Sequence, residues 1–198
     1  MNAARGGPHE LLPGDGSALL FPSFLSIEES GWVLDTLLAQ VPWEITRIPM
    51  FGREVTEPRL SAWIADPGVA YRYSGRDRIV HEWSPVLTDL RDRARDVADS
   101  AFNGVLANLY RDGHDHMGWH ADDERSLGTD PIIASVSLGA DRRFDFRHRT
   151  TGEIVSTVLP HGSLLVMSGP VQRCWKHRIP KAPKVSAQRV NLTYRLLR

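Results

Sequence analysis

The chain has 198 residues, of which 41% are hydrophobic and 24% charged, a composition typical of a single globular domain that can bury a core. Its one cysteine, Cys174, excludes an internal disulfide framework and a cysteine-rich zinc site. No apolar run is long enough to cross a membrane, and the first residues contain no signal-peptide stretch. We therefore expect a cytoplasmic protein that does not associate with membranes.

The formal net charge is zero, but the charges are unevenly distributed. From Ile154 to the end there is no acidic residue, and this segment contains Arg173, Lys176, Arg178, Lys181, Lys184, Arg189, Arg195 and Arg198. Such asymmetry can create one basic face, and phosphate backbones respond to local fields rather than to net charge. A solvated strand surface explains the same pattern, so charge alone leaves both interpretations open.

The first half of the chain predicts an arm and two helices. Residues 1–16 are rich in Gly, Pro and small side chains, which predicts a flexible N-terminal arm. A capping box that begins at Ser26, followed by apolar residues at helical spacing, predicts a helix over 27–40. A second helix is predicted from Pro85, which follows an N-cap serine, to about Asn103.

After Gly104 the sequence changes to short β-type runs separated by turn residues. The predicted strands are Val105–Tyr110, Ile132–Leu138, Arg143–His148, Ile154–Leu159, Ser163–Met167, Cys174–Ile179 and Val190–Leu196. Helices followed by a series of short strands favour an α+β fold that is mainly β. The pattern indicates a β-sandwich or a jelly roll with helical support.

His120 and Asp122 are candidate metal ligands, because their side chains face the same side of the chain if that segment is extended. With the distant His177 they match a 2-His-1-carboxylate facial triad, which leaves positions on Fe(II) for substrate and O₂. Because the chain has 8 histidines, a chance match between exposed polar residues is the alternative. His114 and His116 could also chelate a metal, but neighbouring turn residues favour exposure.

The last predicted strand carries a second candidate site. Polar side chains at Arg189, Asn191, Thr193 and Arg195 alternate with apolar ones, which places two arginines and an amide on one face. An inward arginine needs an anion, and a dicarboxylate is a natural partner for guanidinium groups. Outward arginines on a solvated edge are the alternative.

Several motifs occur in a fixed order: Asn108–Tyr110, Gly118–Glu124, Ser135–Gly139, Arg143–His148, His161–Met167 and Arg189–Arg195. Together they resemble the AlkB family of Fe(II)- and 2-oxoglutarate-dependent dioxygenases that repair alkylated nucleic acid, over about residues 45–198. The resemblance implies Fe(II), 2-oxoglutarate as co-substrate, and O₂. It implies a double-stranded β-helix (jelly roll) in one domain, 17–198, with helical support and nucleotide-recognition hairpins over 17–104 and the catalytic core over 105–198.

The resemblance also implies roles for individual residues. The metal-binding set is His120, Asp122 and His177. The 2-oxoglutarate-binding set is Asn108, Tyr110, Arg189, Asn191 and Arg195. Within the second set, Arg189 would pair with the distal carboxylate, and Arg195 would hold the metal-chelating end of the co-substrate.

The nucleic-acid contacts implied by the resemblance are Phe51, Arg59, Tyr71, Tyr73, Ser74, Asp123 and Glu124. The segment Met50–Gly52 resembles the finger hairpin of members that prefer duplex DNA, in which an apolar wedge holds the space of an extruded base. Phe51 could equally be a core residue. Tyr71 could stack on a flipped base or pack the lid. We hypothesise that Glu124 accepts from an exocyclic amine of the base, whereas Asp123 better fits a solvated turn.

The expected activity is oxidative dealkylation of bases such as 1-methyladenine and 3-methylcytosine in double- or single-stranded DNA, with release of aldehyde, succinate and CO₂. We expect the enzyme to be a monomer. An RNA demethylase on the same scaffold is the nearest alternative. A non-catalytic nucleic-acid-binding module is a second alternative, against which the intact iron and arginine motifs argue.

Overall fold

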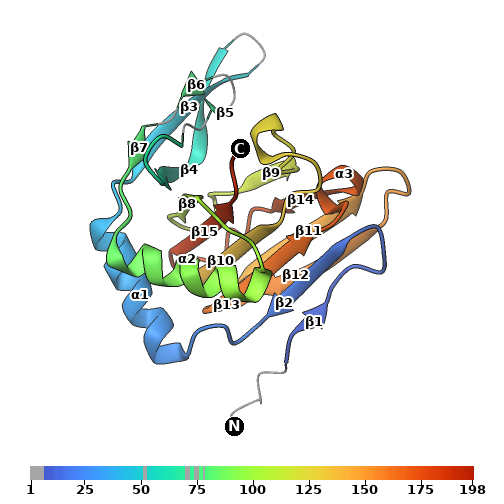
Figure 1. Cartoon of the computed structure of the whole chain (residues 1–198), viewed down its shortest axis with the longest axis horizontal. Helices are drawn as coiled ribbons and strands as arrows, with labels where there is room; N and C mark the ends of the chain where they lie inside the picture. Colours follow the sequence, from blue (N-terminus) through green and yellow to red (C-terminus); the bar gives the residue numbers. More distant parts are fainter. Residues whose placement is uncertain (1–6, 51–52, 70–71, 74–75, 78) are drawn as a thin grey trace.

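The computed structural model in Figure 1 describes residues 7–50, 53–69, 72–73, 76–77 and 79–198. Its helices are α1 (Ile27–Gln40), α2 (Pro85–Ala98), the short α3 (Val171–Cys174) and the 3-10 turn η1 (Arg125–Leu127). Its strands are β1 (His9–Glu10), β2 (Ser17–Phe21), β3 (Glu44–Met50), β4 (Arg53–Ala65), β5 (Arg72–Tyr73), β6 (Arg76–Asp77), β7 (Val80–His81), β8 (Gly104–Tyr110), β9 (Met117–His120), β10 (Ile133–Gly139), β11 (Arg142–His148), β12 (Ile154–Leu159), β13 (Ser163–Ser168), β14 (Trp175–Ile179) and β15 (Arg189–Arg195).

Two antiparallel sheets form the framework. The large sheet has the order β1-β2-β13-β10-β15-β8-β4-β3, with β7 added beside β4, and the small sheet has the order β12-β11-β14-β9. One apolar cluster contains side chains of both sheets, among them Trp63, Leu106, Phe146 and Trp175, so the sheets pack face to face. This arrangement confirms the predicted jelly roll.

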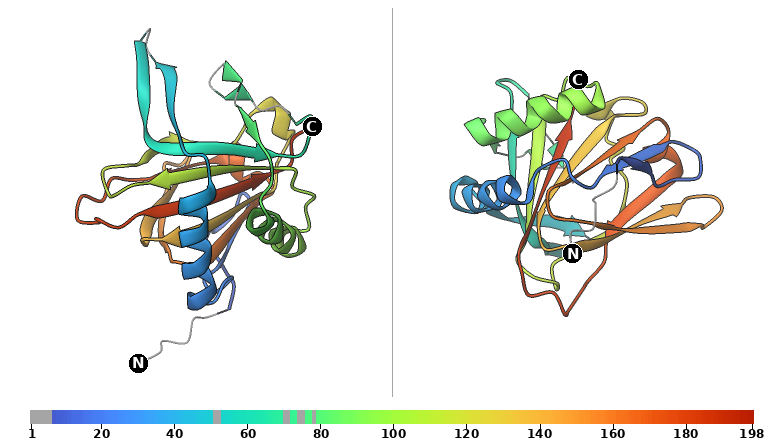
Figure 2. Two further views of the ribbon diagram at one scale, coloured as in Figure 1. Left: turned by 90° about the vertical axis from the view of Figure 1, so that its left-hand side faces the viewer. Right: turned by 90° about the horizontal axis from the view of Figure 1, so that it is seen from below.

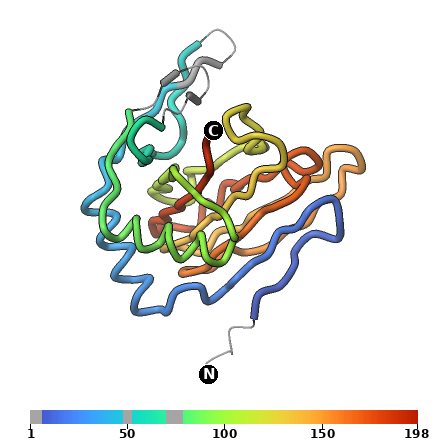
Figure 3. Tube along the Cα trace, viewed as in Figure 1, coloured from blue at the N-terminus to red at the C-terminus, as the bar shows by residue number. Residues whose placement is uncertain are grey.

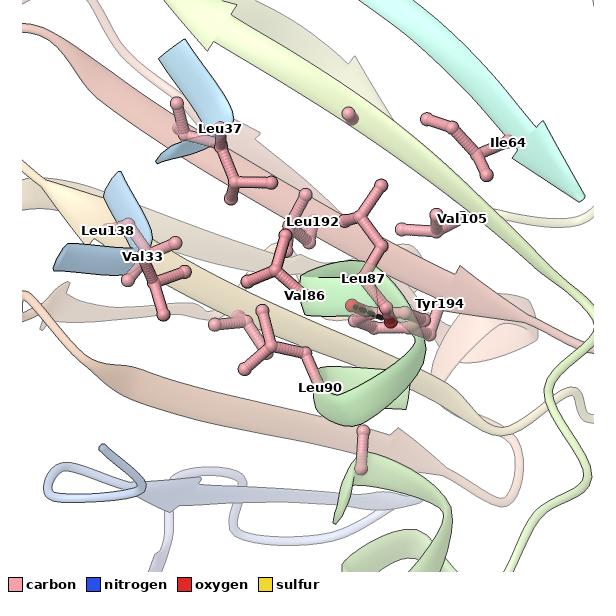
Figure 4. Close-up of a cluster of buried hydrophobic side chains, with 14 of the residues drawn as sticks. Val33, Leu37, Ile64, Val86, Leu87, Leu90, Val105, Leu138, Leu192 and Tyr194 are labelled. Carbon is pink, nitrogen blue, oxygen red and sulfur yellow. Dashed lines mark hydrogen bonds between the residues drawn. The ribbon is translucent and has the colours of Figure 1, made fainter. Parts of the chain in front are cut away.

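The two long helices cover the other face of the large sheet (Figures 1 and 2). Their buried side chains, such as Leu37 of α1 and Leu87 of α2, pack with Leu192 and Tyr194 of β15 (Figure 4). Because side chains alternate along a strand, the apolar residues of β15 face the helices. The polar residues from Arg189 to Arg195 are thereby directed between the sheets, where the site lies.

The first predicted helix is confirmed with the expected bounds, and Ser26 caps it by accepting a hydrogen bond from the Glu29 amide (3.1 Å). The second helix begins as predicted but ends at Ala98 rather than near Asn103. Asp99 adopts a left-handed conformation with φ of 48°, which stops the helix. The seven strands predicted after Gly104 are present, with their ends shifted by at most one residue.

Residues 7–16, the described part of the expected arm, contain a short strand that the sequence analysis did not predict. Residues His9–Glu10 form β1, which pairs with β2. The Glu10 carboxylate accepts hydrogen bonds from the amides of Leu11, Leu12 and Ala18 and from the Ser17 hydroxyl. A polar side chain therefore anchors this segment, and composition alone does not reveal such an anchor.

The hairpin β3–β4 extends away from the sandwich (Figure 2). Its strands pair from Glu44 with Ser61 to Met50 with Arg53, so the resemblance located this hairpin correctly. Phe51 lies outside the described residues. The inner half of β4 pairs with β8, which connects the hairpin directly to a strand of the site.

The C-terminus lies near η1 (Figure 3), and the Arg198 amide donates a hydrogen bond to the Ser126 carbonyl at 2.9 Å. Among the residues that the structure describes, no helix is long and apolar enough to cross a membrane.

Candidate active site

The candidate metal ligands meet between the two sheets. His120 ends β9 and is paired across the small sheet with His177 of β14, and their rings lie edge to face at 4.2 Å. Asp122 follows just beyond β9. One possible ligand atom from each of these three residues lies within 4.8 Å of the other two. The structure therefore brings together the two histidines and the carboxylate expected for a facial triad.

Both histidines are held neutral. Burial lowers the pKa of His177 to about 3, assisted by the adjacent His120, and burial also lowers the pKa of His120. The Nδ1 atom of His120 lies 2.8 Å from the Gly118 carbonyl. A carbonyl can only accept, so this nitrogen carries the proton and Nε2 is left with a lone pair for a metal.

Asp122 is held ionised. Burial alone would raise its pKa, but Arg195 and the two histidines outweigh this effect and lower it. Arg195 Nη2 donates to Asp122 Oδ1 at 2.5 Å, and both side chains are buried. The resemblance placed Arg195 at the metal-chelating end of the co-substrate, and the structure places it directly beside the metal carboxylate.

The surroundings of Arg189 show whether this residue is suited to bind a carboxylate of the co-substrate. Its side chain is 1% exposed; burial lowers its pKa to about 10, so it remains charged at neutral pH. Nη2 donates to Ser137 Oγ (2.9 Å), and the guanidinium lies 5.2 Å from the centre of the Tyr110 ring. Nε and Nη1 have no hydrogen-bond partner within the described part of the chain. A buried cation with two such N–H groups fits a carboxylate.

The two predicted asparagines have protein partners. Asn191 Nδ2 donates to Ser135 Oγ (2.7 Å) and to the Val136 carbonyl (3.0 Å). Asn108 Oδ1 accepts from Arg59 Nε (2.8 Å). Both asparagines and Tyr110 line the pocket that contains the triad. Their positions agree with the predicted co-substrate site, while their amide groups are oriented by neighbouring strands.

The predicted nucleic-acid contacts fall into three groups. Arg59 and Glu124 line the pocket, but Arg59 is buried and paired with Glu57 at 2.9 Å. Asp123 is exposed and forms an ion pair with Arg149 at 3.0 Å, as expected for a solvated turn. The remaining positions, Phe51, Tyr71 and Ser74, lie outside the described residues, and the side chain of Tyr73 is not described.

Sequence reasoning missed several apolar pocket residues, namely Leu106, Met117, Phe144, Met167 and Ile179. Phe144 stacks on His177 with the ring centres 5.4 Å apart. The alternation of Arg143–Arg147 could have identified this residue, because the face of β11 opposite the arginines must point into the sandwich. Such side chains exclude water from the metal ligands.

The competing histidine pair lies away from the triad. His114 is exposed, and Asp115 between the two histidines accepts from Arg111 Nε and Nη2 (both 2.8 Å). Among the described residues, the group of His, Cys, Asp or Glu side chains that could hold a metal ion consists of His120, Asp122 and His177.

Comparison with known proteins agrees with this geometry. The model of the 2OG-Fe(II) oxygenase superfamily matches residues 17–195. Human alkB homolog 3, an alpha-ketoglutarate-dependent dioxygenase, is 40% identical, and the match covers 92% of this chain and 66% of that protein. The human DNA oxidative demethylase ALKBH2 is 37% identical over 98% of this chain and 84% of that protein.

A solved structure, OsALKBH1, has a TM-score of 0.65 at 14% identity and covers 96% of this chain and 99% of its own. At this low identity it supports the fold alone. The chain spans 66% of human alkB homolog 3, slightly less than two thirds. The family match, the ALKBH2 relative and the triad all indicate an iron-dependent oxygenase. Its cofactors and co-substrates are therefore Fe(II), 2-oxoglutarate and O₂. The chain belongs to the AlkB group of the 2OG-Fe(II) oxygenase superfamily.

Proposed function

We propose that this enzyme oxidatively removes alkyl groups from base nitrogens in DNA, with 1-methyladenine and 3-methylcytosine as the expected type of lesion. The observation that carries the proposal is the facial triad in a pocket lined by Tyr110, whose ring centre lies 5.2 Å from the guanidinium of buried Arg189. The Nε and Nη1 groups of Arg189 are suited to a carboxylate. A relative named as a DNA oxidative demethylase supports the choice of polymer.

The protein's own groups divide the task. Bound Fe(II), with 2-oxoglutarate and O₂, supplies the oxidation: the co-substrate becomes succinate and CO₂, and the alkyl carbon gains a hydroxyl that leads to loss of an aldehyde. His120, Asp122 and His177 would hold the metal. Arg189 would fix the distal carboxylate of 2-oxoglutarate, and Arg195 keeps Asp122 ionised and oriented. Positioning is therefore the main contribution of the chain.

The base end of the pocket suits a cationic ring. Glu124 lines the pocket with the metal ligands, and a carboxylate there would favour the positive charge that an N1-alkyladenine or N3-alkylcytosine carries. Aromatic and apolar side chains, including Phe144 and Met117, surround the same space. We infer that the alkylated base enters beside Glu124 with its alkyl group towards the metal ligands.

Basic residues on the outer face of the small sheet support a phosphate-containing partner. On β11 and β14, the guanidinium groups of Arg147 and Arg178 lie 4.6 Å and 4.4 Å from the Trp119 ring centre. Lys176 alternates with His177 on β14 and is partly exposed. Lys176 and Arg178 belong to the acid-free segment from Ile154 to the end, and Arg147 lies on the neighbouring strand, so part of the charge asymmetry gathers on one partly exposed face.

The test is formaldehyde release from oligonucleotides that carry 1-methyladenine or 3-methylcytosine. Single-stranded DNA, duplex DNA and RNA of matched sequence are compared with Fe(II) and 2-oxoglutarate present, and succinate is measured in parallel. We expect turnover on DNA to exceed turnover on RNA. Faster release from RNA would assign the enzyme to RNA demethylation. Absence of release from every polymer, with metal bound, would overturn the proposal.

A further inference from the structure

The position of the metal ligand Asp122 depends on a segment that the strand pairing does not reach. The ladder between β9 and β14 ends at His120, opposite His177, and residues 121–124 form no regular secondary structure. The two histidines are fixed by sheet hydrogen bonds. Asp122 needs another restraint, because a metal ligand displaced by a fraction of an ångström weakens the site.

Gln172 supplies a contact at this point. Its side-chain Oε1 accepts a hydrogen bond from the Asp122 backbone amide at 2.9 Å. Gln172 is 1% exposed and lies in α3, directly before the strand that carries His177. The contact therefore connects the segment of the carboxylate ligand to the segment that leads into the second histidine.

Gln172 is itself held from two sides. Its Nε2 donates to the Met167 sulfur at 3.7 Å. Its backbone carbonyl accepts from Arg149 Nη2 (3.2 Å), and the same Arg149 nitrogen donates to Asp123 Oδ2 (3.0 Å). A buried amide with both ends occupied has little rotational freedom. It can hold the backbone of residue 122 in one place.

We propose that Gln172 is a positioning residue of the iron site, which orients Asp122 through its backbone amide. Gln172 does not contact the metal ligands' side chains in any described hydrogen bond and acts through residue 122 alone. Groups behind metal ligands commonly change metal affinity by 10- to 100-fold. The proposal concerns metal binding, so it is independent of which nucleic acid the enzyme uses.

The decisive variant is Gln172→Met, which keeps the length of the side chain and removes the acceptor. Mn(II), a redox-stable substitute for Fe(II), is titrated by calorimetry into the full-length protein, and the Tm of the metal-free protein is measured. We expect the dissociation constant for Mn(II) to rise about 10-fold. A lower Tm with unchanged Mn(II) affinity would reduce Gln172 to a structural residue and overturn the proposal.

Two further variants keep the test decisive. Gln172→Glu retains an acceptor oxygen at the same distance and should bind Mn(II) more tightly than Gln172→Asn, which withdraws the acceptor by one methylene. If Gln172→Met does not fold, the comparison of Gln172→Glu with Gln172→Asn tests the proposal. Equal affinities of these two variants for Mn(II) would contradict it. Arg173→Gln is the matched control on the same helix, since it breaks only an exposed ion pair with Asp130, and its Mn(II) affinity should be unchanged.

Discussion

The two ends of the pocket are built differently. At the cofactor end, the two histidines and the two arginines lie on paired strands of both sheets, and Asp122 follows just beyond β9. Asp122, His177, Arg189 and Arg195 are all at most 4% exposed. At the outer end, the hairpin β3–β4 carries large apolar side chains in solvent, with Ile45 65% exposed. Burial of charge demands fixed partners, whereas exposed apolar side chains are suited to contact with a partner.

This difference separates two kinds of variant. Changes at the cofactor end should abolish or weaken metal and 2-oxoglutarate binding for every substrate. Changes at the outer end should leave these affinities intact and alter only which base or polymer is processed. The comparison is therefore testable by measuring cofactor affinity and product release in the same variants.

The largest effect is expected for Asp122→Ala. The change removes a metal ligand and leaves Arg195 as a buried cation without this carboxylate partner. We expect Mn(II) affinity to fall by more than about 100-fold, since even the partners of metal ligands are worth 10- to 100-fold, and formaldehyde release to be lost. Retention of Mn(II) affinity within a few-fold of the parent in a calorimetric titration would show that the metal binds elsewhere.

Arg189→Met should have the next largest effect. A charge-assisted hydrogen bond is worth about 1.5–3 kcal/mol, so the KM for 2-oxoglutarate should rise about 10- to 100-fold while Mn(II) affinity stays unchanged. Arg189→Lys is the control, because it keeps the charge and loses the planar geometry that matches a carboxylate. Succinate release at varied 2-oxoglutarate gives the KM values. An unchanged KM for 2-oxoglutarate in Arg189→Met would show that the distal carboxylate does not bind Arg189.

At the base end, Glu124→Gln should lower formaldehyde release from 3-methylcytosine about 10-fold, roughly the value of one charged hydrogen bond. The KM for 2-oxoglutarate should not change, since Glu124 is not one of the predicted 2-oxoglutarate-binding residues. Asp123→Asn is the matched control, because the neighbouring carboxylate is exposed and paired with Arg149. Equal losses in both variants would argue against a specific contact between Glu124 and the base.

The contrast between the two ends also explains what the sequence could predict. Alternation along 189–195 predicted the inward arginines, because strand periodicity determines which side chains share a face. The His-x-Asp pattern predicted two of the three residues that lie together at the candidate metal site. The partner of Asp122 was not predictable: Gln172 lies far along the chain, and a single side-chain acceptor leaves no periodic signal. The end of α2 was missed for a similar reason, since one left-handed residue, Asp99, terminates it.

The smallest effect should appear in stability, through Asp145 on the small sheet behind the metal site. Burial alone would raise the pKa of this carboxyl group, but hydrogen bonds from Ser156, Arg143 and Arg178 outweigh burial and lower it. A carboxyl group whose pKa is lower in the folded than in the unfolded state stabilises the fold at pH values above its unfolded pKa of about 3.9. This stabilisation is lost as the pH falls through the folded pKa.

Asp145→Asn should therefore lower the free energy of unfolding by about 2 kcal/mol at pH 7, with a difference that shrinks below about pH 4. Urea denaturation of both proteins across this pH range measures it. Glu44→Gln is the control at the base of the hairpin, where the partly exposed contact with His81 should contribute no more than about 0.5 kcal/mol. The Asp145 side chain is fully buried and the Glu44 side chain is not. If Glu44→Gln lost more free energy of unfolding than Asp145→Asn, the contrast between a rigid cofactor end and a solvent-exposed outer end would be wrong.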